Sequence, residues 1–212
     1  MTIADVITAI SVAIAALAFV AGVNAWKREF VGKRRIELAE DVLSLFYEAQ
    51  DAIREIRNPF SFGSEGASRK RGEHETEAEA KLLDQAYVVF ERFQKREKLF
   101  AELRSIRYRV MATFGSSAGE PFAQLSEILN EIFSSARILG TYYWPRQGRV
   151  RMSEEELQKH LKEMHKHEAI FWFHGETKDE ITPRVQRAVE KIESIAKEAS
   201  MLKTSWFSKK KK

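Results

Sequence analysis

The chain of 212 residues contains no cysteine and carries a formal net charge of +4 at pH 7. The lack of cysteine excludes structural disulfides, thiolate metal sites and thiol nucleophiles. Positions 27–35 contain five basic residues, and positions 209–212 contain four lysines. The positive charge of these two clusters exceeds the net charge of the whole chain. The net charge therefore reflects two local clusters, and we do not expect nucleic acid as a partner.

Residues 6–23 form an apolar run without any charged side chain. A hydrocarbon core about 30 Å thick requires roughly twenty helical residues, and residues 3–25 supply that length. The run predicts a transmembrane anchor over residues 1–26. A cleaved signal peptide is the alternative, but such peptides carry positive charge before the apolar core, and no Lys or Arg precedes this run.

The residues that follow the run indicate the orientation of the anchor. An indole ring favours the headgroup region, and Lys and Arg favour the cytoplasmic side. The predicted membrane-interface residues are Trp26, Lys27, Arg28, Lys33, Arg34 and Arg35. We therefore expect the N-terminus outside and the rest of the chain in the cytoplasm, at a bacterial inner membrane. Anionic lipid headgroups are the expected partner of the basic residues.

The periodicity of apolar residues is helical almost everywhere after residue 35, and no strand pattern is present. We divide this part into a basic juxtamembrane and amphipathic helix over 27–57, a polar linker over 58–72, a helical bundle over 73–203 and a basic tail over 204–212. The first helix ends before Pro59, because the residue that precedes proline is driven out of the α region.

Three features organise the bundle segment. Residues 73–114 contain neither proline nor glycine, which predicts one long helix. Ser153 and Glu156 match a capping box that begins another helix. Apolar residues at 181–202 alternate in steps of four and three, a heptad seam typical of coiled-coil packing, and Thr182 is the predicted N-cap of that helix.

The expected fold class is therefore all-α. A single N-terminal transmembrane helix precedes a cytoplasmic antiparallel helical bundle with long helices.

Two motifs resemble known sites of chemistry. Residues 115–119 match G-x-S-x-G, but the nucleophile elbow requires a strand before the serine, so we interpret them as a turn between helices. His160 and His167 lie seven residues apart, near two further histidines, but match no metal-binding spacing. We expect a solvated face there. We assign no catalytic, cofactor-binding or metal-binding residue and expect no cofactor.

The best candidate for a contact with a partner or an acidic ligand is a predicted loop, because loops often carry function. Its residues are Tyr142, Tyr143, Trp144, Arg146, Arg149 and Arg151.

These features favour a non-enzymatic, membrane-tethered helical interaction, adaptor or sensor module that acts at the cytoplasmic face of the membrane and binds a protein partner. The alternative is an oligomeric single-span effector that forms pores or perturbs the membrane and is gated by its helical domain. Small residues four apart in the anchor, such as Ala18 and Gly22, permit the close helix approach that a homo-oligomer requires.

Overall fold

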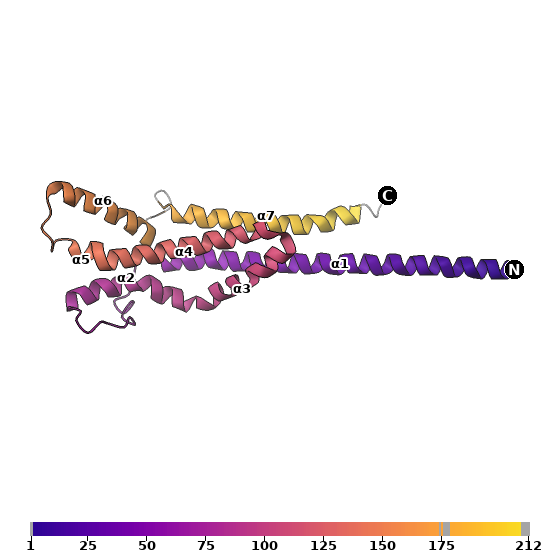
Figure 1. Ribbon diagram of the computed structural model, residues 1–212, viewed down its shortest axis with the longest axis horizontal. Coiled ribbons are helices and arrows are strands. Elements are labelled where there is room, and N and C mark those ends of the chain that lie inside the picture. Colours follow the sequence, from indigo (N-terminus) through magenta and orange to yellow (C-terminus); the bar gives the residue numbers. More distant parts are fainter. Residues whose placement is uncertain (1, 174, 176–178, 209–212) are drawn as a thin grey trace. The chain divides into compact units, whose positions relative to one another are not determined.

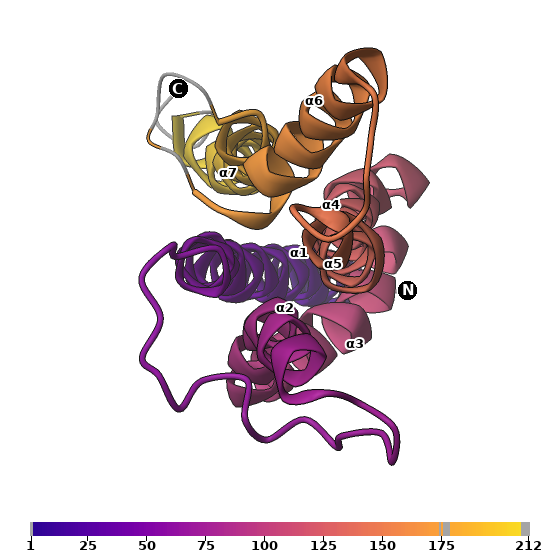
Figure 2. The ribbon, with the colours of Figure 1, turned by 90° about the vertical axis from the view of Figure 1, so that its left-hand side faces the viewer.

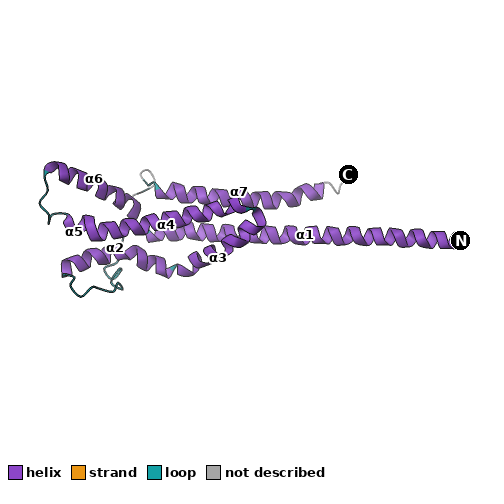
Figure 3. Cartoon of the chain, viewed as in Figure 1, coloured by secondary structure: helices purple, strands orange, loops and turns teal. Residues whose placement is uncertain are grey.

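The computed structural model describes residues 2–173, 175 and 179–208. Helices and turns make up this described part, and it contains no strand (Figure 3). The predicted all-α class is confirmed.

The elements follow one another along the chain as shown in Figure 1. They are α1 (Ile3–Ile56), α2 (Glu77–Lys95), α3 (Glu97–Phe114), the 3-10 turn η1 (Ser116–Gly119), α4 (Glu120–Ile138), the π-helical turn η2 (Leu139–Tyr143), α5 (Trp144–Arg146), α6 (Glu154–Phe171) and α7 (Ile181–Ser208). The chain divides into two compact units: residues 1–41 with 195–212, and residues 42–194. In the predicted basic tail, residues 204–208 form the end of α7, and the lysines at 209–212 lie outside the described residues.

In the first unit, α1 is helical from Ile3 without a break between the apolar run and the basic flank. Among the described residues, α1 is the one helix long and apolar enough to cross a membrane, and none of its most apolar segment is buried. Large side chains such as Ile14, Leu17 and Phe19 are more than 60% exposed. A helix that is apolar on all sides requires an apolar environment.

In the second unit, the C-terminal part of α1 contributes to the core. Phe46 is fully buried, and its ring meets Phe122 of α4 edge to face at 4.9 Å. Phe133 of α4 stacks on Phe90 of α2 at 5.0 Å. Seen end on in Figure 2, α2, α4 and the part of α7 that belongs to this unit lie around the C-terminal part of α1. Side chains of the predicted heptad seam in this unit are buried, namely Ile181, Val185, Ala188 and Ile192.

The prediction of one helix over 73–114 is wrong. Arg96 leaves the helical region, with φ −110° and ψ 12°, and separates α2 from α3. Its guanidinium donates to Glu55 Oε2 at 2.6 Å. Phe93 and Phe100 stack with centroids 5.0 Å apart, although Cα atoms seven apart in a straight helix are separated by roughly 10 Å. The segment therefore bends at Arg96, where the chain has neither proline nor glycine.

The polar segment over 58–72 is attached to α2. Glu91 of α2 accepts hydrogen bonds from the backbone N–H of Gly66 at 2.9 Å and from the Ser68 hydroxyl at 2.7 Å. Arg69 binds Asp84 of α2 at 3.0 Å. These bonds hold the segment against the helix along much of its length.

Candidate functional site

The site is built on the π-helical turn η2, which directly continues α4. Such turns are rare and occur frequently at functional sites. Gly140 allows the close approach of α2, since a Cβ atom there would lie 2.6 Å from the Cβ of Ala86. The turn places Tyr142 and Tyr143 next to each other, with their rings edge to face at 5.0 Å. Tyr142 to Arg146 are thus helical in the structure and not part of a loop.

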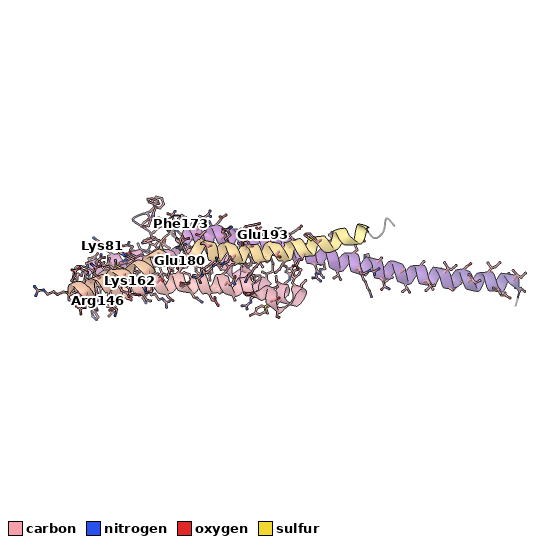
Figure 4. The ribbon with its side chains drawn as sticks, turned by 90° about the horizontal axis from the view of Figure 1, so that it is seen from above. Lys81, Arg146, Lys162, Phe173, Glu180 and Glu193 are labelled. Carbon is pink, nitrogen blue, oxygen red and sulfur yellow. The ribbon has the colours of Figure 1, made fainter. Side chains whose placement is uncertain are left out.

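A surface pocket of about 300 Å³ lies between this segment and α6. Four of the predicted contact residues line it, namely Tyr142, Tyr143, Arg146 and Arg151. The other lining residues are Val150, Met152, Glu156, Lys159, His160 and Glu163. The site, which we call the Tyr–Arg pocket, therefore combines residues 142–152 with the first part of α6, which follows them in the chain and folds back on them. Figure 4 labels Arg146, the last residue of α5, and Lys162, which lies on α6.

Trp144 and Arg149 lie outside the Tyr–Arg pocket. Trp144 is buried, its Nε1 donates to Glu168 Oε1 at 2.9 Å, and its ring meets Phe171 edge to face at 5.5 Å. Trp144 and Arg149 line a different pocket of about 430 Å³. Trp144 therefore joins α5 to α6 by packing, because its indole has a large apolar surface and one donor.

The cations of the Tyr–Arg pocket form no ion pair within the described part of the chain, although the charge of Arg146 acts on Glu156. Arg146, Arg151 and Lys159 form no ion pair there. The Arg146 guanidinium lies 4.7 Å from the centroid of the Tyr142 ring, a cation–π contact. This contact orients the guanidinium without neutralising its charge.

Both carboxylates of the pocket are engaged elsewhere. Glu156 accepts the backbone N–H of Ser153 at 2.8 Å, which completes the predicted capping box. This backbone hydrogen bond, aided by the Ser153 hydroxyl, lowers the pKa of Glu156. Glu163 pairs with Lys166 at 2.7 Å, and this hydrogen bond lowers the pKa of Glu163. Neither carboxylate forms an ion pair with Arg146, Arg151 or Lys159 in the described residues, although the charge of Arg146 also contributes to lowering the pKa of Glu156.

The expectation of a solvated histidine face is wrong for His160 and His167. His160 is only 8% exposed, and its Nε2 has no hydrogen-bond partner among the described residues. His167 Nδ1 lies 3.1 Å from the hydroxyl of Ser135 in α4. Burial lowers the pKa of His167, although Glu163 opposes that effect. In the fold, this face of α6 lies against α4 and η2. The residue pattern of α6 alone did not indicate this contact.

The ionisable side chains do not form a metal centre in the described residues, where no three His, Asp or Glu side chains converge. His174 lies outside the described residues. The G-x-S-x-G segment lies between α3 and α4, with Gly115 at φ +101°. This is the helix-terminating glycine expected of a turn.

The predicted membrane-interface residues all lie on α1. Trp26 is 64% exposed and stacks on Phe30 at 5.8 Å, and the Arg34 guanidinium lies 5.5 Å from the Phe30 centroid. Lys33 pairs with Glu37 at 3.8 Å. Lys27 and Arg28 are exposed, whereas Arg35 is half-buried.

Residue pattern alone did not identify Lys159 and His160 as part of the site. The one available signal is the placement of His160 four residues before Met164, which is also buried. This spacing puts both residues on one face of α6. Compared with protein-family models, with curated proteins and with solved structures, the chain matches none.

Proposed function

We propose that the protein is a membrane-tethered helical module that holds a binding surface at the cytoplasmic face of the membrane. The observation that carries this proposal is the composition of α1 (Ile3–Ile56), which contains the apolar run, the basic flank and the buried core residue Phe46 in one helix. The same helix is thus suited both to a bilayer and to a folded domain.

The lipid-facing role of α1 is supported by its side chains. Exposed apolar residues cover the segment that precedes Trp26, and in lipid such a helix satisfies all of its backbone hydrogen bonds internally. Trp26, Phe30 and Arg34 follow at intervals of four residues and contact one another in sequence. Aromatic and basic side chains in this order suit the headgroup region.

The binding role is supported by the Tyr–Arg pocket. In this proposal, the helices of residues 42–194 form an antiparallel bundle, and the pocket with its unpaired cations is the surface that receives a partner or a signal. The role is recognition, with no reaction assigned to the pocket.

The anchor is tested by membrane fractionation of the full chain and of a variant without residues 1–26. We expect the full chain to remain in the membrane after a carbonate wash, and the shortened variant to be released. A full chain that is released by carbonate would contradict the tether.

The orientation is tested with cysteine variants, because the natural chain has no cysteine. In spheroplasts, an impermeant thiol reagent should label Thr2→Cys directly and Ser64→Cys only after the membrane is opened. Both positions are exposed, so the two variants are matched controls. The reverse pattern would contradict a cytoplasmic second unit.

The native mass after gentle extraction tests the pore-forming alternative. A monomer or dimer that carries a different protein would support the module. A homogeneous assembly of many copies, with channel conductance in planar bilayers, would contradict it.

A further inference from the structure

The Tyr–Arg pocket contains an excess of hydrogen-bond donors. Apart from its two engaged carboxylates and two apolar side chains, each lining residue carries an N–H or O–H group: Tyr142, Tyr143, Arg146, Arg151, Lys159 and His160. Burial raises the pKa of the Tyr143 hydroxyl, so this hydroxyl keeps its proton. A complementary ligand therefore presents several acceptor atoms close together.

The charge of the pocket specifies that ligand further. Arg146, Arg151 and Lys159 have no ion-pair partner within the described residues, whereas Glu163 pairs with Lys166 and Glu156 accepts hydrogen bonds from the backbone N–H and hydroxyl of Ser153. A ligand with two negative charges and at least three acceptor oxygens satisfies this arrangement better than a carboxylate. A phosphoryl group has these properties at neutral pH.

Two buried atoms at the site are without partners. His160 Nε2 and Arg146 Nε are inaccessible to solvent and form no hydrogen bond within the described chain. Buried polar atoms are usually satisfied, and leaving them unpaired is costly. This arrangement is expected of groups that are held in place for a ligand, since the guanidinium of Arg146 already lies over Tyr142.

From these observations we propose that the Tyr–Arg pocket binds the phosphoryl group of a small soluble molecule. Its volume of about 300 Å³ is at the lower end of the range for small-molecule sites, which suits a nucleoside monophosphate or a sugar phosphate. The exposed face of Tyr142, which is 48% exposed, offers a stacking surface for a base. The inference rests on the proposed binding role of the second unit and is independent of the membrane tether.

The test is calorimetry on the full chain in a maltoside detergent, which carries no phosphate. The probes are inorganic phosphate, adenosine monophosphate, glucose 6-phosphate and, as the matched uncharged compound, adenosine. We expect at least one phosphorylated probe to bind, with adenosine at least tenfold weaker, and affinity to decrease as salt increases.

Variants locate the binding in the pocket. Arg146→Gln and Lys159→Gln should each weaken binding by tenfold or more. Arg149→Gln and Lys162→Gln should leave it unchanged, because Arg149 lines the other pocket and Lys162 is an exposed residue of α6 outside the Tyr–Arg pocket. Circular dichroism confirms that each variant is folded. In the unchanged protein, the Nε2 resonance of His160 should shift when the probe is added.

Three outcomes with the soluble probes and the variants would overturn the inference. They are no binding of any phosphorylated probe at millimolar concentration, equal binding of adenosine and its monophosphate, or equal losses in the Arg149→Gln control. Binding of a short-chain phosphatidic acid without binding of the soluble probes would assign the phosphoryl group to a lipid and would also contradict it. Fractionation remains unaffected by each of these results, so a failure here is distinct from a failure of the tether.

Discussion

The guanidinium of Arg57 and the carboxylate of Asp179 form a bidentate ion pair inside the second unit. The Nη2–Oδ1 and Nη1–Oδ2 distances are 2.6 and 3.0 Å, and the side chains are 1% and 0% exposed. Arg57 directly follows α1, and Asp179 precedes α7 by two residues. The pair therefore joins the end of one helix to the beginning of another.

Each partner also satisfies backbone groups at a helix end. Arg57 donates to the carbonyls of Ala169 and Ile170 at 2.8 Å, which closes the C-terminus of α6. Asp179 accepts the backbone N–H of Thr182 at 2.9 Å. The prediction of Thr182 as an N-cap is wrong, because α7 begins at Ile181 and the cap comes from Asp179.

Arg57→Met should destabilise the second unit by about 3–5 kcal/mol, because it leaves a buried carboxylate without its charge partner. It also removes the hydrogen-bond donors of the carbonyl groups at the end of α6. The free energy of unfolding in urea measures this. Arg54→Met is the matched control. Arg54 is 55% exposed and lies 3.9 Å from Asp51, so we expect a change below about 1 kcal/mol. Equal effects would contradict the role of the buried pair.

Arg92 of α2 binds the segment that follows α1. It donates to the carbonyls of Asn58 and Phe60 at 2.6 and 2.7 Å and to Glu65 at 2.7 Å. Arg92→Met should cost about 3–5 kcal/mol and should raise the pKa of Glu65, which the hydrogen bond from Arg92 lowers.

Urea unfolding and carboxyl NMR titration check these two effects of Arg92→Met. Arg96→Met is the control: it removes an exposed ion pair with Glu55, and we expect it to lower the free energy of unfolding by less than about 1 kcal/mol. An unchanged pKa of Glu65 in Arg92→Met would contradict the assignment.

Gly66 lies where the polar segment meets α2. Its φ is +85°, and a Cβ atom there would overlap the backbone carbonyl of Asp84. Gly66→Ala should therefore cost about 2–4 kcal/mol, through steric overlap and a disfavoured backbone conformation. Gly63→Ala has open space and should change the free energy of unfolding by less than about 0.5 kcal/mol. A tolerated Gly66→Ala variant would show that the segment is not held against α2.

His167 makes the stability of the second unit depend on pH near neutrality. Its pKa lies below the ordinary value of 6.5, mainly because of burial, beside Ser135 of α4 and the ring of Tyr143. Glu163 favours its protonation and Lys166 opposes it. Because the unfolded chain binds the proton first, the contribution of His167 is complete above pH 6.5 and decreases as pH falls through the folded-state pKa.

Unfolding in urea between pH 5 and 8 measures this dependence, and imidazole NMR gives the pKa directly. His167→Gln should reduce the change in unfolding free energy over this range. Since Gln can still bond the Ser135 hydroxyl, the variant tests the charge and keeps the polar contact. A pKa above 6.5 would contradict the prediction.

Features that depend on neighbouring residues could be predicted from the amino-acid sequence. The capping box of Ser153 and Glu156 was predicted and is confirmed, because its bonds lie within one helical turn. The buried positions Val185, Ala188 and Ile192 follow from the repeat along one helix. The long apolar segment of α1 was equally evident, since composition and length define it.

Contacts between residues far apart in the chain, in contrast, follow from the packing of the helices. Arg57 pairs with a residue 122 positions away, and no local pattern predicts such a partner. At the bend between α2 and α3, Arg96 pairs with Glu55 of α1, 41 positions away. Likewise, Arg146 and Arg149 have the same charge and lie three residues apart, yet they line different pockets. The π-helical turn and the packing of α6 determine which pocket each arginine lines, because they set the direction in which each side chain points.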